Sequence, residues 1–135
     1  MPALKLQVAP LQNPERYRLL ASALTRLMAD ILHKDAALTA VLIEDLPAAR
    51  WIVGGADVQR PTALLEANIT AGTNTAEEKA AFIAAAHAEL HRQLAPFDQL
   101  EEASYVIVRE VPAGDWGYAG LTQRERQLRR AAVPA

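Results

Sequence analysis

An internal repeat constrains the fold of this chain more than any other feature of its sequence. An acidic residue, an aliphatic residue, proline, alanine, tryptophan and glycine occur in the same order twice, 65 positions apart, over 45–55 and again over 110–120. Each copy follows a run that is typical of a strand, Thr39–Ile43 in the first and Ser104–Val108 in the second. Such self-similarity indicates two equivalent supersecondary units.

The segments upstream of each copy also match in pattern. Apolar residues alternate with other residues, as in half-buried strands, at Leu4, Leu6 and Val8 and again at Leu65, Ala67 and Ile69. A helix is expected after each strand. Asn13 and Pro14 suit the start of the first helix, and Thr75–Glu78 forms a capping box for the second. The apolar stripes of the two helices are Leu20, Leu24, Leu27, Met28 and Ile31, and Phe82, Ile83, Ala86, Leu90 and Leu94.

This order predicts an α/β fold made of a tandem β-α-β pseudo-repeat. We expect units over 2–55 and 62–120, a linker over about 56–61, and a basic tail over 121–135. Parallel pairing within each unit would give a four-stranded mixed sheet with both helices on one face. The 135 residues suffice for one domain, over 1–120. The many alanines leave a thin core, so we expect subunits to pack together.

Composition narrows the classes of function. Fourteen Lys and Arg against sixteen Asp and Glu give a net charge of −2, which disfavours a nucleic-acid binder. The absence of cysteine excludes disulfides and thiolate chemistry. No apolar run approaches the length of a membrane helix, and the first residues lack a signal-peptide pattern. A cytoplasmic protein with no membrane or nucleic-acid partner is expected.

Pro2 is the candidate catalytic residue. Methionine is normally removed before a small residue such as proline, which would leave a secondary amine at the chain start. The pKa of a free α-amino group is about 7.7–8.0, and burial lowers it. Such an amine is a general base near neutral pH without histidine or glutamate. If Met1 is retained, the nitrogen of Pro2 is an amide and cannot act as a base.

An N-terminal proline on a strand, a β-α-β unit and the closing repeat motif together resemble the tautomerase superfamily, over about residues 2–120. The resemblance implies catalysis by the N-terminal proline without a cofactor or metal, and a homotrimer for chains with two units. Three segments carry it: Arg50–Gly55 is similar to the hairpin of 4-oxalocrotonate tautomerases, Glu44–Ala48 to cis-3-chloroacrylic acid dehalogenases, and Asp115–Tyr118 to malonate semialdehyde decarboxylases.

The resemblance also implies a set of substrate-binding residues. Lys34 falls where macrophage migration inhibitory factor has a substrate-binding lysine, and Tyr105 where a neighbouring subunit contributes a tyrosine. Thr70 lies near the strand end that lines the pocket, and Trp51 and Trp116 occupy aromatic positions near its mouth. For each, a plain structural role is the alternative: a helix-end cation for Lys34, a sheet residue for Tyr105, and core or interface anchors for the tryptophans.

Arginine is missing where related enzymes grip two carboxylates. Thr70–Thr75 contains none, and the strand-start arginine of 4-oxalocrotonate tautomerases falls on Ala40 and Tyr105. Because arginine binds a carboxylate through two hydrogen bonds, its absence argues against a dicarboxylate substrate. Arg109 shares a strand face with Tyr105 and would supply positive charge if that strand end reaches the pocket.

We therefore expect a cofactor-free tautomerase or isomerase that acts on a small enol or 2-oxo acid with one carboxylate. One alternative is a dehalogenase, hydratase or decarboxylase of a three-carbon acid, with a cationic clamp from Arg50, Arg109 or Lys34. The other is a non-catalytic trimer that acts through protein partners.

Three further patterns receive structural interpretations. His87 and His91 lack a third ligand and are expected on a half-exposed helix face, without a metal. Asp45 is expected to be a capped or solvated strand end. The tail arginines are expected on a solvated helix packed against a neighbouring subunit.

Overall fold

Two β-α-β units of similar length follow one another along the chain. The computed structural model describes residues 2–132, so Met1 and its expected removal lie outside the described residues, as do residues 133–135 of the tail. The elements are β1 (Ala3–Ala9), α1 (Pro14–Leu32), η1 (Ala36–Leu38), β2 (Ala40–Asp45), η2 (Ala48–Arg50), β3 (Ile52–Val53), β4 (Ala56–Asp57), β5 (Thr62–Thr70), α2 (Ala76–Leu94), β6 (Tyr105–Val111), β7 (Gly117–Tyr118), β8 (Leu121–Thr122) and α3 (Gln123–Ala132).

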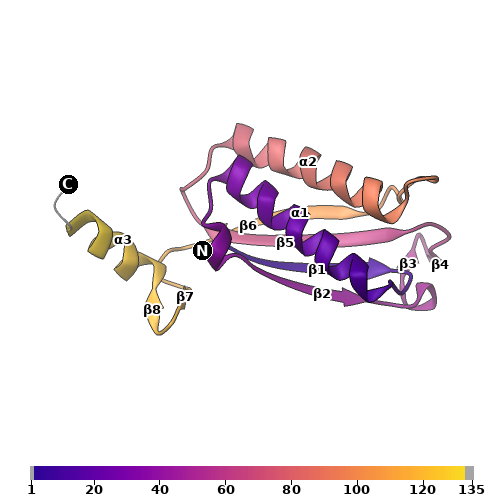
Figure 1. Cartoon of the computed structure of the whole chain (residues 1–135), viewed down its shortest axis with the longest axis horizontal. Coiled ribbons are helices and arrows are strands. Elements are labelled where there is room, and N and C mark those ends of the chain that lie inside the picture. The colour runs from indigo at the N-terminus through magenta and orange to yellow at the C-terminus, as the bar shows by residue number, and fades with distance from the viewer. Residues whose placement is uncertain (1, 133–135) are drawn as a thin grey trace.

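The main sheet has the strand order β2-β1-β5-β6. β1 pairs with β2, and β5 with β6, in parallel, whereas the central pair of β1 and β5 is antiparallel. α1 and α2 lie side by side on one face of this sheet, and the other face has no helix (Figure 1). The expected mixed four-stranded sheet with both helices on one face is confirmed.

Local sequence signals set the helix starts. The side chain of Asn13 accepts a hydrogen bond from the backbone N–H of Glu15, and Pro14 occupies the first turn of α1. At the start of α2 the Thr75 and Glu78 side chains each accept a hydrogen bond from the other residue's backbone N–H. Both predicted caps are confirmed.

The core lies between the two helices and the sheet. Its largest fully buried side chains include Phe82, Leu4, Leu24, Met28 and Leu90. The expected stripe on α2 is wrong at one position, because Ile83 is 39% exposed. Successive helix residues are rotated by about 100°, so the face that buries Phe82 turns Ile83 outward.

Each unit closes with a two-stranded hairpin, β3–β4 in the first and β7–β8 in the second. Ala56–Asp57 is thus a strand, and the expected linker begins two residues later, at Val58. The two hairpins lie at opposite ends of the sheet, and the N-terminus lies at the end that carries β7, β8 and α3 (Figure 1). Each end of the sheet therefore carries one hairpin, and the N-terminus lies at the end of the second hairpin.

Asp45 ties the end of β2 to the connection between β1 and α1. Its Oδ2 accepts hydrogen bonds from the Gln12 backbone N–H at 2.7 Å and from the Tyr17 hydroxyl at 2.6 Å. This agrees with the expected capped strand end. The Gln12 N–H and then the Tyr17 hydroxyl lower the pKa of the Asp45 carboxyl, because both bind its charged form.

We expect Asp45→Ala to lower the urea midpoint of unfolding at pH 7, by less than a core substitution does. A carboxyl with a lowered folded-state pKa stabilises the protein above its unfolded pKa, and that stabilisation is lost as pH falls through the folded pKa. The difference between wild type and variant should therefore shrink below about pH 4. A difference that stays constant from pH 7 to pH 3 would contradict this assignment; Glu44→Ala on the same strand is the control.

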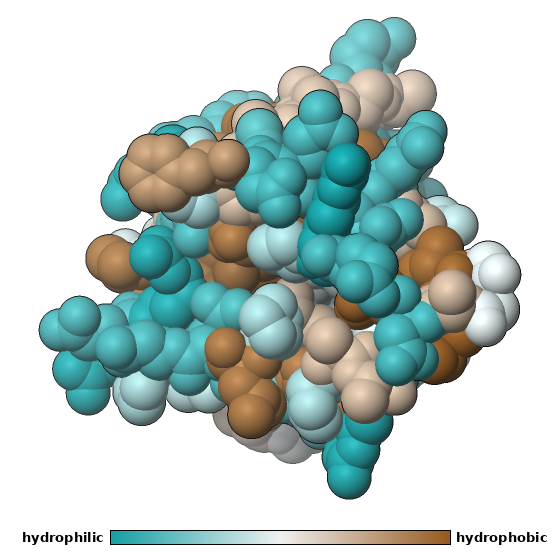
Figure 2. Space-filling model, turned by 90° about the vertical axis from the view of Figure 1, so that its right-hand side faces the viewer, coloured by the Kyte–Doolittle hydropathy of each residue, from teal (hydrophilic) through white to brown (hydrophobic). Residues whose placement is uncertain are grey.

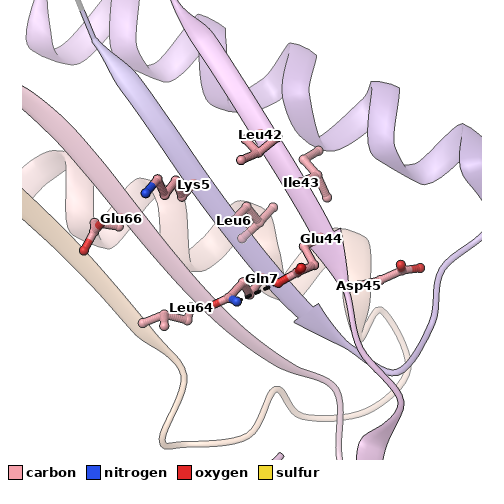
Figure 3. A pocket seen from close by; sticks show the side chains of 9 residues that line it. All are labelled: Lys5, Leu6, Gln7, Leu42, Ile43, Glu44, Asp45, Leu64 and Glu66. Atoms are coloured by element: carbon pink, nitrogen blue, oxygen red, sulfur yellow. Dashed lines mark hydrogen bonds between the residues drawn. The ribbon is translucent and has the colours of Figure 1, made fainter. Parts of the chain in front are cut away.

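The helix-free face of the sheet is partly apolar. Leu42 is 65% exposed and Tyr105 is 61% exposed on this face. A shallow hollow of about 630 Å³ lies there, lined by Lys5, Gln7, Glu44 and Glu66 among others, and the Gln7 side-chain amide donates to Glu44 (Figure 3). Seen from the β3–β4 end, hydrophobic side chains also surface in several places among hydrophilic ones (Figure 2). This face thus exposes apolar side chains among charged ones.

None of the helices within residues 2–132 has the length and apolarity needed to span a membrane.

Candidate active site

Pro2 directly precedes β1 and lies between two walls, which are formed by the start of β2 and the end of β5. Its carbonyl oxygen accepts a hydrogen bond from the Ala40 N–H, at the start of β2. On the other side Ala3 is paired with Asn68, so Pro2 lies opposite Ile69, one residue before the end of β5. Pro2 is buried. Because strand side chains alternate, its ring shares the face of Leu4, which the helices cover.

A cavity of about 280 Å³ opens at this end of the sheet. Leu38 lines it from the segment before β2, and Thr70 lines it from the end of β5, so both walls that flank Pro2 contribute to it. Pro2 does not itself line the cavity. The remaining lining residues come from the end of α1, the turn after β5, the β7–β8 hairpin and α3: His33, Lys34, Asp35, Thr73, Tyr118, Gln123, Gln127 and Arg130. The structure therefore brings the predicted residues Lys34 and Thr70 together at one cavity, at the end of the sheet where Pro2 lies.

The turn after β5 holds Lys34 in place. The Lys34 ammonium donates to the Thr73 hydroxyl at 2.8 Å, and that hydroxyl donates to the Thr70 carbonyl at 2.6 Å. The Asn74 side-chain amide donates to the Leu32 carbonyl at 3.0 Å, which joins the same turn to the end of α1. His33 ends α1 with a positive φ of 59°, which turns the chain toward the cavity.

Burial lowers the pKa of Lys34, and the carboxylates of Glu78 and Glu110 offset part of this effect. Desolvation disfavours the charged ammonium, so an anion that enters the cavity would recover part of the lost stabilisation. A half-buried lysine with one neutral partner is suited to bind a carboxylate or to polarise a carbonyl oxygen.

The other predicted site residues are distributed over both ends of the sheet. Trp116 precedes β7 at the Pro2 end, and its carbonyl accepts from the Gln123 N–H. Tyr105 and Trp51 lie together at the opposite end, where they line a separate hollow with Leu64. Within one chain they are therefore remote from Pro2.

Arg109 lies on the helix-free face of the sheet. It is paired with Asn68 across the strands, and its guanidinium donates to Glu66 at 3.3 Å. The Glu66 carboxylate therefore offsets much of its charge. In a single chain Arg109 faces away from the side of the sheet that buries Pro2.

Sequence reasoning missed the contribution of α3 to this cavity. Gln123, Gln127 and Arg130 line it from three positions of that helix. Their spacing of four and three residues was the available signal, because such residues share one helix face. The sequence predicts for the tail only a solvated helix packed against a neighbouring subunit, since no local pattern places it near the end of α1.

His87 and His91 are exposed on α2. His91 contacts the Asp98 carbonyl at 3.0 Å. Over residues 2–132, no group of three or more His, Asp or Glu side chains is arranged to hold a metal ion.

Comparisons with known proteins address the class of this fold and site. Residues 2–59, the first β-α-β unit with its hairpin, match the family model described as "Tautomerase enzyme". No curated protein sequence matches the chain.

Solved structures match over nearly the whole chain. A fused 4-OT designated Q0, described as a symmetric trimer, is 26% identical with a TM-score of 0.76, covering 90% of this chain and 96% of its own. The fused 4-OT R7, described as an asymmetric trimer, is 24% identical with a TM-score of 0.80, covering 93% and 98%. The protein N1, described as a member of the cis-3-chloroacrylic acid dehalogenase family, is 23% identical with a TM-score of 0.79, covering 98% and 92%.

Two fused β-α-β units that share one four-stranded sheet define a tautomerase-like α/β protein. The chain belongs to the tautomerase superfamily.

Proposed function

We propose that this protein is a cofactor-free tautomerase in which Pro2, after removal of Met1, is the general base and acid. The observation that carries the proposal is the position of Pro2, buried between the start of β2 and the end of β5, at the same end of the sheet as a cavity lined by Lys34. A buried secondary amine is largely neutral near pH 7 and is available to accept a proton.

The proposed reaction moves one proton. The Pro2 nitrogen takes it from the hydroxyl of a small enol acid, and the resulting ammonium returns it to the neighbouring carbon as the carbonyl forms. Lys34 donates a hydrogen bond to the oxygen that carries the developing charge. Preorganised donors of this kind stabilise the transition state without further reorganisation.

We also propose that the active form is a homotrimer. The fused 4-OT structures Q0 and R7 are trimers, and the exposed apolar side chains of the helix-free face favour burial by another copy. A neighbouring subunit would then be able to bring its Tyr105 and Trp51 end to the Pro2 end of this chain. Light scattering should give three times the chain mass of 14.7 kDa; a monomer at micromolar concentration would contradict the proposal.

The experiment that tests the function uses two forms of the same chain. One begins at Pro2, as verified by intact mass, and the other keeps a short extension that turns the Pro2 nitrogen into an amide. We expect the first to ketonise phenylenolpyruvate, followed by ultraviolet absorbance, and the second to be inactive. Equal activity of the two forms would exclude Pro2 as the base.

A dehalogenase or hydratase is the second candidate, favoured by the similarity to N1. It requires a cationic clamp for a three-carbon acid, for which Lys34, Arg50 and Arg109 were the sequence candidates. Arg109 is already paired with Glu66. Release of halide from 3-chloroacrylate by a protein that does not ketonise the enol would favour this candidate over the first.

The proposed roles of Pro2 and Lys34 predict a pH profile with two limbs. On the acid side kcat/KM falls as Pro2 becomes protonated, and on the alkaline side it falls as Lys34 loses its proton. Because the pKa of Lys34 is lowered, the alkaline fall should begin below the usual lysine value of about 10.4. Lys34→Arg should move this limb upward, since a guanidinium stays protonated.

The measurement is the rate from pH 5 to 10 after subtraction of the uncatalysed rate. Lys79→Arg is the control, because Lys79 pairs with Glu110 and does not line the cavity. An alkaline limb that is unchanged in Lys34→Arg would show that another group controls it.

A further inference from the structure

The second hairpin and α3 contain an unusual group of unsatisfied donors. Three buried side-chain nitrogens lack an acceptor within the described part of the chain: Trp116 Nε1, Gln123 Nε2 and Arg126 Nε. All three belong to the segment over 116–126. Buried polar atoms without a partner are uncommon in native proteins, so these three donors call for acceptors from outside the chain.

Gln123 belongs both to this group and to the cavity at the Pro2 end of the sheet. It is only 3% exposed, and it is one of the residues that line the cavity. Arg130 lines the same cavity from the last turn of α3, and Lys34 lines it from the segment that follows α1. Two cations and an amide donor thus meet at one cavity.

Asp35 is the acidic residue among those that line the cavity, and the carboxylates of Glu78 and Glu110 act on Lys34 without lining it. The Asp35 side chain accepts a hydrogen bond from the Ala37 N–H and caps η1. Lys34 has a neutral hydroxyl as its hydrogen-bond partner. The polar side chains of the cavity therefore favour an anionic acceptor.

The hairpin fixes α3 at this position. The Arg126 guanidinium lies over the Tyr118 ring, 3.7 Å from its centroid, and donates to the Tyr118 carbonyl at 2.9 Å. The Arg124 N–H donates to the Ala113 carbonyl at 2.9 Å. A side chain at Gly117 would collide with the carbonyl of Leu121, so the hairpin closes only with glycine there.

We propose, on the basis of the tautomerase function above, that α3 supplies the carboxylate clamp of the active site. The Arg130 guanidinium and the Gln123 amide hold the carboxylate of a small monoacid substrate, and Lys34 remains available for the oxygen that becomes the carbonyl. Arg130 on α3 would thus supply the positive charge that the turn over 70–75 lacks, because that turn contains no arginine. Arg130 and Gln123 act as positioning and specificity residues and take no part in the proton transfer.

The test compares Arg130→Gln with Arg129→Gln, its neighbour on α3 that does not line the cavity. The substrates are phenylenolpyruvate and the enol of its neutral methyl ester. We expect Arg130→Gln to raise KM for the acid by about 10- to 100-fold, with kcat little changed, because a charge-assisted hydrogen bond is lost. The ester should be converted equally well by both variants and the wild type.

Binding provides a readout that does not depend on turnover. Calorimetric titration with 3-phenylpropanoate, an unreactive monocarboxylate, should show a weaker Kd for Arg130→Gln by a factor similar to the change in KM. Gln123→Leu removes the amide at nearly constant volume and should weaken binding without lowering the thermal midpoint, because it also removes an unsatisfied buried donor. Circular dichroism verifies that α3 is retained in each variant.

The outcomes separate this inference from the proposed function. If the wild type binds 3-phenylpropanoate, Arg130→Gln binds it weakly and neither converts the enol, the clamp stands and the tautomerase reaction fails. If the wild type converts the enol acid and Arg130→Gln matches Arg129→Gln in KM and in Kd, the clamp is overturned. Equal loss for the acid and the ester would also overturn it, since a carboxylate contact cannot affect the ester.

Discussion

Pro2→Ala should lower kcat/KM for ketonisation of phenylenolpyruvate by about 100-fold or more, which is the usual contribution of a positioned general base. The variant keeps an α-amine after removal of Met1, so some activity should remain. The pyrrolidine ring fixes φ and holds the nitrogen of Pro2 in one orientation on β1, whereas the primary amine of alanine rotates and is better hydrated. The loss therefore measures the positioning of the base as well as its basicity.

Pro14→Ala is the matched control, because Pro14 begins α1 and is exposed. It should leave kcat/KM within about twofold, as is usual for surface substitutions. Intact mass must first show that Met1 is absent from all three proteins. A Pro2→Ala variant with wild-type kcat/KM would show that another residue is the base.

Phe82→Ala should have the largest effect on stability. Phe82 is fully buried between α2 and the sheet, and truncation of a buried phenylalanine costs about 3–5 kcal/mol in the free energy of unfolding. This is a large share of the roughly 5–15 kcal/mol that stabilises a typical domain. The measurement is urea unfolding at one fixed protein concentration, because association would otherwise shift the midpoint.

Ile83→Ala is the control for Phe82→Ala. The two residues are adjacent and were assigned to one apolar stripe, but Ile83 is 39% exposed. We expect Ile83→Ala to cost roughly 1 kcal/mol or less. Equal costs at the two positions would mean that Ile83 is buried in solution, and contact with another subunit would be the first explanation to examine.

The sequence carries enough local information to predict the fold of both units. The helix starts depend on contacts over three residues, such as the reciprocal hydrogen bonds of Thr75 and Glu78, and the same signal is visible in the printed sequence. The strands follow from alternation, and the repeat over 45–55 and 110–120 indicates that the two units share one architecture. Parallel pairing within each unit follows because a helix connects the two strands.

The candidate site was predictable only in part. Pro2 was identified from its place in the sequence, and Lys34 and Thr70 from a resemblance; the structure places the latter two at one cavity, at the Pro2 end of the sheet. Trp51 is remote from Pro2 within one chain because it follows the far end of β2, which is parallel to β1. Tyr105 is remote because the antiparallel pairing of β1 and β5 places the start of β6 at that same end. That pairing turns the second unit end for end, so equivalent segments of the two units occupy opposite ends of the sheet.

The sequence alone was sufficient to predict the elements, their caps and their order, because each depends on neighbours a few positions away. The tertiary structure decided which distant segments meet at the Pro2 end. Lys34, Thr70, Gln123 and Arg130 share a cavity although almost a hundred positions separate the first from the last. Their meeting depends on the register of β1 with β5 and on the turn of the second hairpin, which no local pattern encodes.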